Sequence, residues 1–259
     1  MRIRKHKYIF TIEVNIIFYT YKENNKMKNT IKGYVLFDGK SELNGRDIIA
    51  IATLNSKNEK TGPMQQLWIL DKHTAPHTAA KEGKNDSVCG DCPIKDQCYV
   101  TLHQAPLSVW NAYHRGIYDT SFIDGTGIEQ DIFAKWILRF GAYGDPAALP
   151  RYLVATLSRL VKDFTGYTHQ WNKPQFAYLS RYFMASVENT DLAKQAAEKG
   201  FRTFRVKSKE MPVNDQEIVC LADSRGITCR ECKLCNGSKM AKNIVIDAHG
   251  AKSKGIIYA

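Results

Sequence analysis

The chain has 259 residues, of which 44% are hydrophobic and 24% are charged. This length is enough to bury the core of one large domain or two small ones, and the composition is typical of a soluble globular protein rather than a disordered one. No run of about 18 uncharged apolar residues occurs, so a membrane-spanning helix is not expected. The formal net charge of +11 is spread without a long basic run. It allows nucleic acid or another polyanion as a partner but does not require one.

The first 26 residues differ from the rest of the chain. They combine a basic start with an apolar stretch, but Glu13 interrupts that stretch and no small-residue cleavage site follows. A secretory signal peptide is therefore not expected. We predict that residues 1–26 are an irregular N-terminal extension. Residues 27–259, which begin at a second methionine, are predicted to form a single α/β domain in the cytoplasm.

Apolar runs predict strands, and apolar residues three or four positions apart predict helices. Asp145, followed by Pro146, is the expected N-cap of a helix that continues to residue 164. Asn189 or Thr190 is expected to cap another helix, which ends at a glycine. The predicted strands are residues 33–37, 47–54, 66–70, 136–141, 164–169, 182–189, 202–207, 217–223 and 243–250, and a further helix is predicted over residues 94–118.

Strands that alternate with helices through short connections predict a parallel sheet covered by helices. The number of predicted strands favours a partial or complete (β/α) barrel over a small open sheet. Cysteine-rich loops at residues 86–100 and 218–238 are the predicted metal-binding segments. The chain contains neither GxGxxG nor a P-loop motif, so the common nucleotide sites are not indicated.

The first cysteine group consists of Cys89, Cys92 and Cys98, in the spacing Cys-x2-Cys-x5-Cys. An odd total of seven cysteines without an export signal disfavours a disulfide framework, and grouped cysteines in a reducing compartment typically bind metal. The two-residue gap lets two sulfurs reach one ion within a tight turn. Three thiolates leave a coordination position open for solvent, substrate or a fourth protein ligand. His77 and His103 are the nearby candidates for that ligand.

The second cysteine group consists of Cys220, Cys229, Cys232 and Cys235. Its successive two-residue gaps are typical of loops that hold a cubane iron–sulfur cluster, whereas zinc sites usually separate two CxxC pairs by a longer stretch. We therefore predict a 4Fe–4S cluster, with zinc as the alternative. The sequence leaves two arrangements open: a three-cysteine site plus a four-cysteine site, or a single shared site with spare thiols.

Several motifs resemble those of a family of uncharacterised phage and plasmid proteins, which is itself similar to radical-SAM-like barrel proteins. The resemblance extends over residues 27–257. The motifs that carry it are KTGPMQQLWIL, SVCGDCP, LRFGAYGDPAALP, GYTHQW, FMASVEN, DLAKQAAEKGFRTFRV and the CxxCxxC segment.

The resemblance implies that the first cysteine group holds a 4Fe–4S cluster whose free iron binds S-adenosylmethionine, and that reductive cleavage of this cofactor gives a carbon radical. It also implies that the backbone of Gly141, Tyr143 and Gly144 contacts the cofactor, and that the second group holds an auxiliary cluster. The cysteine spacing differs from the Cys-x3-Cys-x2-Cys that is usual in radical-SAM proteins.

Catalytic candidates lie where predicted strands end, because the carboxyl ends of barrel strands carry the chemistry of such folds. They are His169, Glu188 and Asp145, together with His249. For Asp145, capping of the following helix is the better explanation. For the two histidines, ordinary packing or loop hydrogen bonding is the alternative.

Three arginines, Arg139, Arg202 and Arg205, lie in predicted strands. Alternation places Arg139 on the face opposite its neighbour Leu138. A buried arginine such as Arg205 needs an anionic partner, and Glu188 is a candidate for that partner or for a substrate ligand.

The sequence thus predicts an iron–sulfur cluster-binding protein, with a radical or redox enzyme that acts on a nucleic-acid-related or other anionic substrate as the leading hypothesis. The alternative is a factor, stabilised by zinc or a cluster, that binds nucleic acid or a host protein without catalysis. A protein encoded by a phage or mobile element would act in the host cytoplasm, and no membrane partner is expected.

Overall fold

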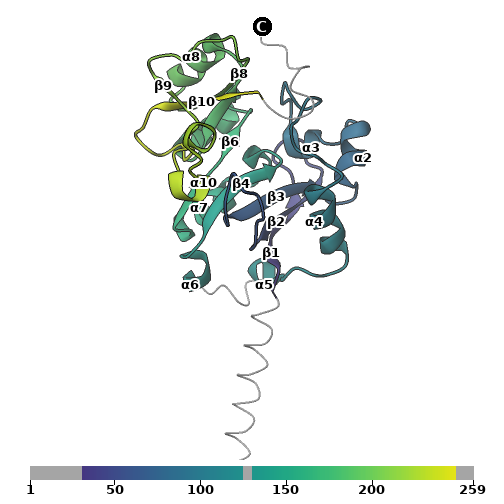
Figure 1. Cartoon of the computed structure of the whole chain (residues 1–259). Coiled ribbons are helices and arrows are strands. Elements are labelled where there is room, and N and C mark those ends of the chain that lie inside the picture. Colours follow the sequence, from purple (N-terminus) through teal and green to yellow (C-terminus); the bar gives the residue numbers. More distant parts are fainter. Residues whose placement is uncertain (1–30, 125–129, 249–259) are drawn as a thin grey trace, which may run out of the picture. The chain divides into compact units, whose positions relative to one another are not determined.

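The computed structural model describes residues 31–124 and 130–248. The chain divides into two units, Met1–Lys32 and Gly33–Ala259, and the second is described here by itself. The predicted extension over residues 1–26 and the candidate His249 lie outside the described residues. The elements (Figure 1) are β1 (Gly33–Lys40), β2 (Asp47–Thr53), β3 (Gln65–Asp71), α2 (Pro76–Lys81), α3 (Asp86–Cys89), α4 (Ala105–His114), α5 (Ser121–Asp124), α6 (Gln130–Phe133), β4 (Ile137–Tyr143), the 3-10 helix η1 (Pro146–Ala148), α7 (Arg151–Leu160), β5 (Asp163–Thr165), β6 (Tyr167–Thr168), the 3-10 helix η2 (Pro174–Arg181), β7 (Met184–Val187), α8 (Thr190–Glu198), β8 (Thr203–Lys207), β9 (Glu217–Val219), α9 (Leu221–Arg225), α10 (Cys229–Cys232) and β10 (Asn243–Asp247).

The strands form two five-stranded sheets. In the first, with the order β1-β2-β3-β4-β5, β2 is antiparallel to both β1 and β3, whereas β3, β4 and β5 run parallel to one another. In the second, with the order β6-β7-β8-β10-β9, all neighbours are parallel. The predicted α/β class is therefore confirmed. The prediction of a complete barrel is wrong for residues 31–124 and 130–248, because their strands form two sheets and no closed ring.

A single chain segment, residues 163–168, connects the two sheets. Its first half is β5, which pairs with β4, and its second half is β6, which pairs with β7. Gly166 separates the two halves, and a Cβ atom at this position would lie 2.6 Å from Cδ1 of Phe183 and 3.1 Å from Cβ of Phe140. Only glycine therefore allows the segment to pass this close to the aromatic rings beneath it.

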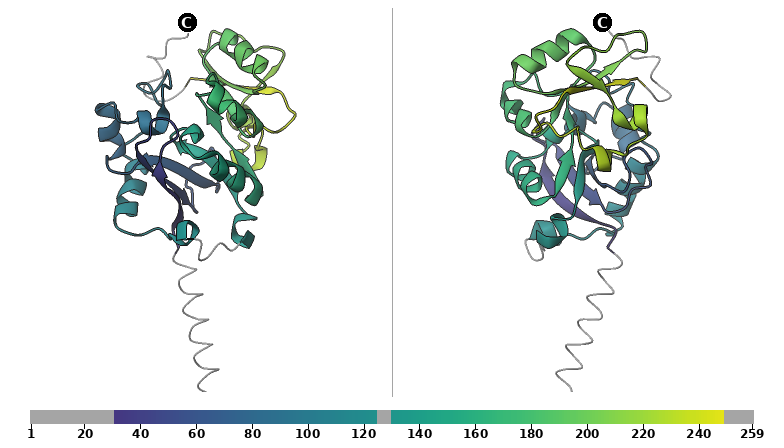
Figure 2. Two further views of the ribbon diagram at one scale, coloured as in Figure 1. Left: turned by 180° about the vertical axis from the view of Figure 1, so that it is seen from behind. Right: turned by 60° about the vertical axis from the view of Figure 1, so that its left-hand side comes forward.

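Helices cover the sheets as the strand–helix alternation predicts (Figures 1 and 2). Helices α2 and α4 contact β3, α3 contacts β2 and β3, and α8 contacts β7 and β8. The continuous apolar run of β2, DIIAIAT, is buried along most of its length, as expected for a strand with both faces covered. Within the described ranges, no helix is both long and apolar enough to cross a membrane.

The helix predicted over residues 94–118 is shorter in the structure. Only Ala105–His114 is helical, and Pro106 lies in its first turn. Proline is tolerated there because its missing N–H has no partner at a helix start. The preceding residues form turns around Cys92 and Cys98, so the helical spacing of apolar residues does not extend to the cysteines.

The helix predicted after Asp145 is divided into two. The Asp145 carboxylate does cap a helix, since Oδ1 accepts a hydrogen bond from the Ala147 N–H at 2.9 Å, but that helix is the short η1. A residue before proline is disfavoured from helical conformation, and Leu149, which precedes Pro150, is extended with ψ 148°. Helix α7 then begins anew at Arg151.

The predicted start and end of α8 are confirmed. Oδ1 of Asn189 accepts a hydrogen bond from the Leu192 N–H at 2.8 Å, which makes Asn189 the N-cap. Gly200 has φ +82°, the left-handed conformation that favours glycine after a helix.

Arg205 forms a buried ion pair that crosses the second sheet. Its side chain in β8 is fully buried, and Nε and Nη2 donate to Oε1 and Oε2 of Glu217 at 2.7 and 2.6 Å. Nη2 also donates to the carbonyl of Pro212 at 2.8 Å. The prediction that Glu188 is the partner of Arg205 is wrong, because the Glu188 carboxylate lies beside His169. The pair thus fixes β8 and β9 on either side of β10.

We predict that Glu217→Gln lowers the free energy of unfolding by about 3–5 kcal/mol, because it leaves a buried guanidinium without a counter-charge. The matched control is Asp47→Asn, which removes a carboxylate from the exposed pair with Lys40 and should cost at most about 1 kcal/mol. Urea denaturation of both variants measures the difference. Equal decreases in the free energy of unfolding would show that the buried pair contributes no more to stability than the exposed pair.

Candidate metal centre: two cysteine groups on one cavity

A cavity of about 330 Å³ lies against one face of the parallel strands. Alternate residues of the strands form its floor, including Arg139 and Tyr143 of β4, Phe204 and Val206 of β8, and Tyr167 of β6. Alternation along a strand places such residues on one face. Six of the seven cysteines also line the cavity: Cys89, Cys92, Cys98, Cys220, Cys229 and Cys235. The structure thus brings together two groups that are far apart in the sequence.

The first cysteine group follows β3 and begins where helix α3 ends. Cys89 is the last residue of α3, and Gly90 then turns the chain with φ +57°. A Cβ atom on Gly90 would lie 2.7 Å from Nε2 of Gln170, which itself donates to the Cys89 carbonyl at 3.2 Å. An ion pair of 2.9 Å joins Asp91 to Lys173. The segment after β6 therefore holds the turn between the first two cysteines.

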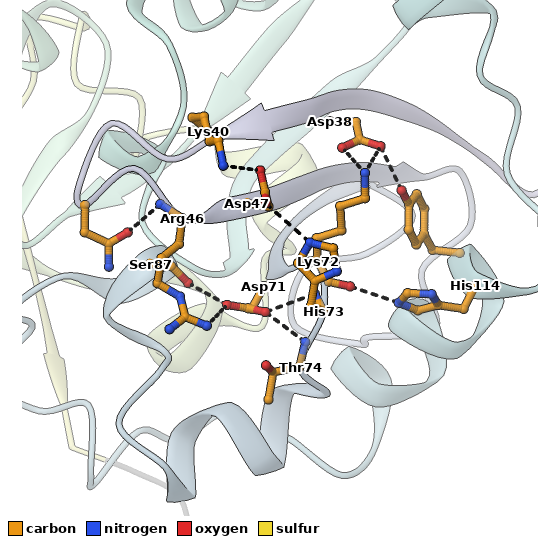
Figure 3. A network of polar contacts seen from close by, with 12 residues as sticks. Asp38, Lys40, Arg46, Asp47, Asp71, Lys72, His73, Thr74, Ser87 and His114 are labelled. Atoms are coloured by element: carbon orange, nitrogen blue, oxygen red, sulfur yellow. Dashed lines mark hydrogen bonds and ion pairs between the residues drawn. The ribbon is translucent and has the colours of Figure 1, made fainter.

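A buried carboxylate at the end of β3 fixes helix α3 (Figure 3). Oδ2 of Asp71 accepts hydrogen bonds from Nη2 of Arg46 at 3.0 Å and from the hydroxyl of Ser87 at 3.3 Å. Oδ1 accepts from the backbone N–H groups of His73 and Thr74 at 3.0 and 2.8 Å. Because Ser87 lies two residues before the first cysteine, this network sets where the first group begins.

His169 lies next to the first cysteine group. Its Nε2 is 3.3 Å from Oε1 of Glu188, and its ring also interacts with the Cys92 thiol. Burial lowers the pKa of His169. The interactions with Cys92 and Glu188 raise it by more than burial lowers it, so the net pKa is well above its usual value. The sequence candidates His169 and Glu188 are thus brought together beside a cysteine.

The GAYGD turn at the end of β4 forms the wall next to the first group. Gly141 and Gly144 have φ +66° and +85°, and a Cβ atom on Gly144 would lie 2.7 Å from the carbonyl oxygen of Ile69. The backbone N–H of Asp145 donates to the Val88 carbonyl at 2.6 Å, next to the first cysteine. The two glycines are required for this close approach, and they also line the cavity as the predicted cofactor-binding residues.

Tyr143 and Asp145 face the cavity from the same turn. The Tyr143 side chain is buried, and burial followed by the nearby Cys89 raises the pKa of its hydroxyl. The Asp145 carboxylate accepts hydrogen bonds from the backbone N–H groups of Ala147 and His169 at 2.9 and 2.7 Å, while burial raises its pKa. Capping therefore accounts for Asp145, as the sequence favoured.

The second cysteine group is held by strand backbone and by the loop before β3. Cys220 follows β9, and its N–H donates to the Val245 carbonyl at 2.9 Å. The N–H of Cys229 donates to the Lys60 carbonyl at 3.0 Å, and the Cys235 carbonyl accepts from Gly166 at 3.1 Å. The contact with residue 60 was missed by the sequence analysis, since nothing in the local pattern connects positions so far apart.

Thiols of the same group affect the pKa of the buried cysteines. Burial first, and then Cys92 and Cys98, raise the pKa of Cys89. Burial raises the pKa of Cys235 to about 12, although a hydrogen bond with Tyr167 lowers it; the neighbouring thiols that raise it are Cys220, Cys229 and Cys232. The thiols that raise the pKa of Cys89 thus belong to the first group, and those that raise the pKa of Cys235 belong to the second.

All seven cysteines are free thiols. Over residues 31–124 and 130–248, no three His, Cys, Asp or Glu side chains already lie in an arrangement that could hold a metal ion. His77 and His103 are exposed and do not line the cavity, so neither is placed as a fourth ligand. The thiols are therefore gathered by the fold, but their ligand geometry is not yet formed.

Comparison with known proteins found no matching family model, no matching curated protein and no matching solved structure. The resemblance to radical-SAM-like proteins therefore remains a prediction.

Arg202 holds the loop that carries the last cysteine. Its Nη1 donates to the carbonyls of Leu234 and Asn236 at 3.0 and 2.8 Å, and its Nε donates to that of Ala241 at 2.9 Å. Nη2 donates to the carbonyl of Lys242. One guanidinium thus satisfies four carbonyl groups on both sides of the turn that follows Cys235.

We predict that Arg202→Met increases amide hydrogen exchange of residues 234–242 by at least about tenfold, because hydrogen bonds from a charged donor are lost. Exchange followed by mass spectrometry measures this, and Arg181→Met, at an exposed position of η2, is the control. Unchanged exchange in the Arg202 variant would mean that other contacts hold the loop.

Proposed function

We propose that this chain is an iron–sulfur protein with two cysteine-held clusters that face one small-molecule cavity. The first group, Cys89, Cys92 and Cys98, would hold a cluster with one open coordination position. The second group would hold a closed cluster through its four thiolates. The observation that carries the proposal is that six cysteines from two distant segments line the same cavity.

The chemistry of the donors fits such clusters. Soft thiolate ligands favour iron–sulfur clusters or zinc over harder cations. Three thiolates on one side, with His169 and Tyr143 beside them, leave a position for an exogenous ligand. Four thiolates on the other side, with Tyr167 next to Cys235, suit a closed site. Hydrogen-bond donors around the sulfurs are the groups by which proteins tune cluster potential.

The cavity favours an enzyme over an electron carrier. Its volume of about 330 Å³ is at the lower end of the roughly 300–1,000 Å³ typical of small-molecule sites. A closed electron carrier needs no such space beside its cluster. We therefore favour redox or radical chemistry on a small molecule.

S-adenosylmethionine is the co-substrate that the sequence resemblance implies for the open position. When bound, it would supply a carbon radical after one-electron reduction. Gly141, Tyr143 and Gly144 of the β4 turn line the cavity, and they would contact this co-substrate.

We expect protein purified without oxygen to be brown and to contain about eight iron and eight sulfide ions per chain, as two 4Fe–4S clusters require. Replacing Cys92 and Cys98 together by alanine should leave about half of the iron, and so should replacing Cys229 and Cys232 together. These four side chains are only partly buried, which limits effects on folding. Iron and acid-labile sulfide analysis measures the result.

A colourless protein with stoichiometric zinc would overturn this proposal in favour of a metal-stabilised binding factor. Complete loss of iron from either double variant would instead show that the two groups form one shared site.

The reaction with S-adenosylmethionine has a separate test. Dithionite-reduced wild-type protein should release 5′-deoxyadenosine, and the Cys229/Cys232 double alanine variant should retain this activity. The Cys92/Cys98 double variant should lose it, because the open position belongs to the first group. Chromatography of the products measures the release. Iron-loaded wild-type protein that forms no 5′-deoxyadenosine would remove the radical reaction and leave the clusters.

A further inference from the structure

Arg139 places a positive charge inside the cavity, between the two cysteine groups. Its Nη2 donates to the Tyr99 hydroxyl at 2.7 Å, and Tyr99 directly follows the first cysteine group in the chain. On its other side, the guanidinium interacts electrostatically with Tyr167 and with Cys229 of the second group. Arg139 therefore lies where both groups meet the open space.

The other cationic side chains of the cavity wall already have carboxylate partners. Lys60 pairs with Asp223 at 2.7 Å, and Lys95 pairs with Asp86 at 2.6 Å. Arg139, by contrast, has no ion pair with any carboxylate of residues 31–124 and 130–248. A guanidinium removed from water without a counter-charge is unfavourable, so an anion at this position would be stabilised.

The surface beside Arg139 is apolar. Phe204 and Val206 of β8 and Ile246 of β10 line the same cavity. The facing wall, from the loop of the first cysteine group, adds Ile94 and Leu102. A ligand bound here would therefore contact one cationic group and a largely hydrocarbon surface.

We propose that the cavity binds a small amphiphilic anion. Its carboxylate or phosphate head would pair with Arg139 and Tyr99, and its apolar body would lie over Phe204, Val206 and Ile246. A planar guanidinium recognises either kind of head through paired hydrogen bonds. This inference names the substrate class of the proposed enzyme and rests on the proposed function for its reaction, but the binding itself needs no cluster.

Calorimetric titration with octanoate, octyl phosphate and octan-1-ol tests the binding, because the three probes share an apolar chain and differ in the head. The protein is the full chain, purified without oxygen. We expect at least one of the two anions to bind at least about tenfold more tightly than the alcohol. Comparison of octanoate with octyl phosphate identifies the preferred head.

Variants separate the contribution of charge from that of the apolar surface. Arg139→Met should abolish the preference for the anion and leave binding of octan-1-ol unchanged, and Arg139→Lys, which keeps the charge, should retain part of the preference. Val206→Thr should weaken all three probes alike. Arg159→Met, in an exposed part of α7, is the control and should bind like the wild type.

Iron analysis of the same samples keeps the two proposals apart. Loss of the anion preference with unchanged metal content supports the site. An anion preference that persists in Arg139→Met overturns it, and so does wild-type protein that binds the anions no better than the alcohol. Loss of the second cluster in Arg139→Met with an intact preference would also overturn it, since Arg139 would then serve the cysteines. If the wild type holds zinc, the titrations still decide the anion site.

Discussion

Both cysteine groups depend on one short stretch of backbone, residues 163–169. It pairs with β4 on one side and with β7 on the other. Tyr167 contacts Cys235, and His169 contacts Cys92. These two residues are separated by one position in an extended chain, which is about 7 Å. The spacing between these two contacts is therefore that of neighbouring residues on one side of an extended chain.

Two of the cysteines, Cys220 and Cys235, are buried. Strand backbone holds Cys220 and Cys235 through hydrogen bonds, but the side chains that surround the sulfurs are tyrosines, a histidine and other thiols. Burial raises the pKa of Cys89 and Cys235, so these two thiols stay protonated at neutral pH in the metal-free protein. A metal must displace those protons, and its charge then compensates the buried thiolates. Thiols in this environment favour metal binding over free thiolate chemistry.

Local patterns in the sequence were enough to identify most strands and the ends of α8, because hydrophobic runs and helix caps act over a few residues. They could not give the direction of pairing, so β1 and β2, which are antiparallel, look like the parallel strands that follow. Local patterns also do not show where contacts with distant segments end a helix. The turns that present Cys92 and Cys98 replace helix where the apolar spacing alone predicted it.

Side-chain partners were harder to predict than elements. Arg205 was correctly expected to need an anion, but its partner came from β9, and Glu188 paired with His169 instead. The partner of Arg205 depends on which strands flank β10. The residues next to Arg205 in the sequence do not predict that strand order. The cysteine spacing gives two groups along the sequence. That both groups border one cavity depends on contacts between distant segments, such as the hydrogen bond from the Cys229 N–H to the carbonyl of Lys60.

The first cysteine loop joins two roles through adjacent residues. Cys98 belongs to the proposed open metal site, and Tyr99, the next residue, hydrogen-bonds to Arg139. About half of the Tyr99 side chain is exposed, whereas the guanidinium is partly buried beneath it. A metal bound by Cys98 would fix the backbone at that point and with it the direction of the phenol. Loading of the first site would therefore also shape the anion site, because one short loop carries both the sulfur and the hydroxyl. In the proposed enzyme, an arrangement of this kind would couple assembly of the metal centre to recognition of its substrate.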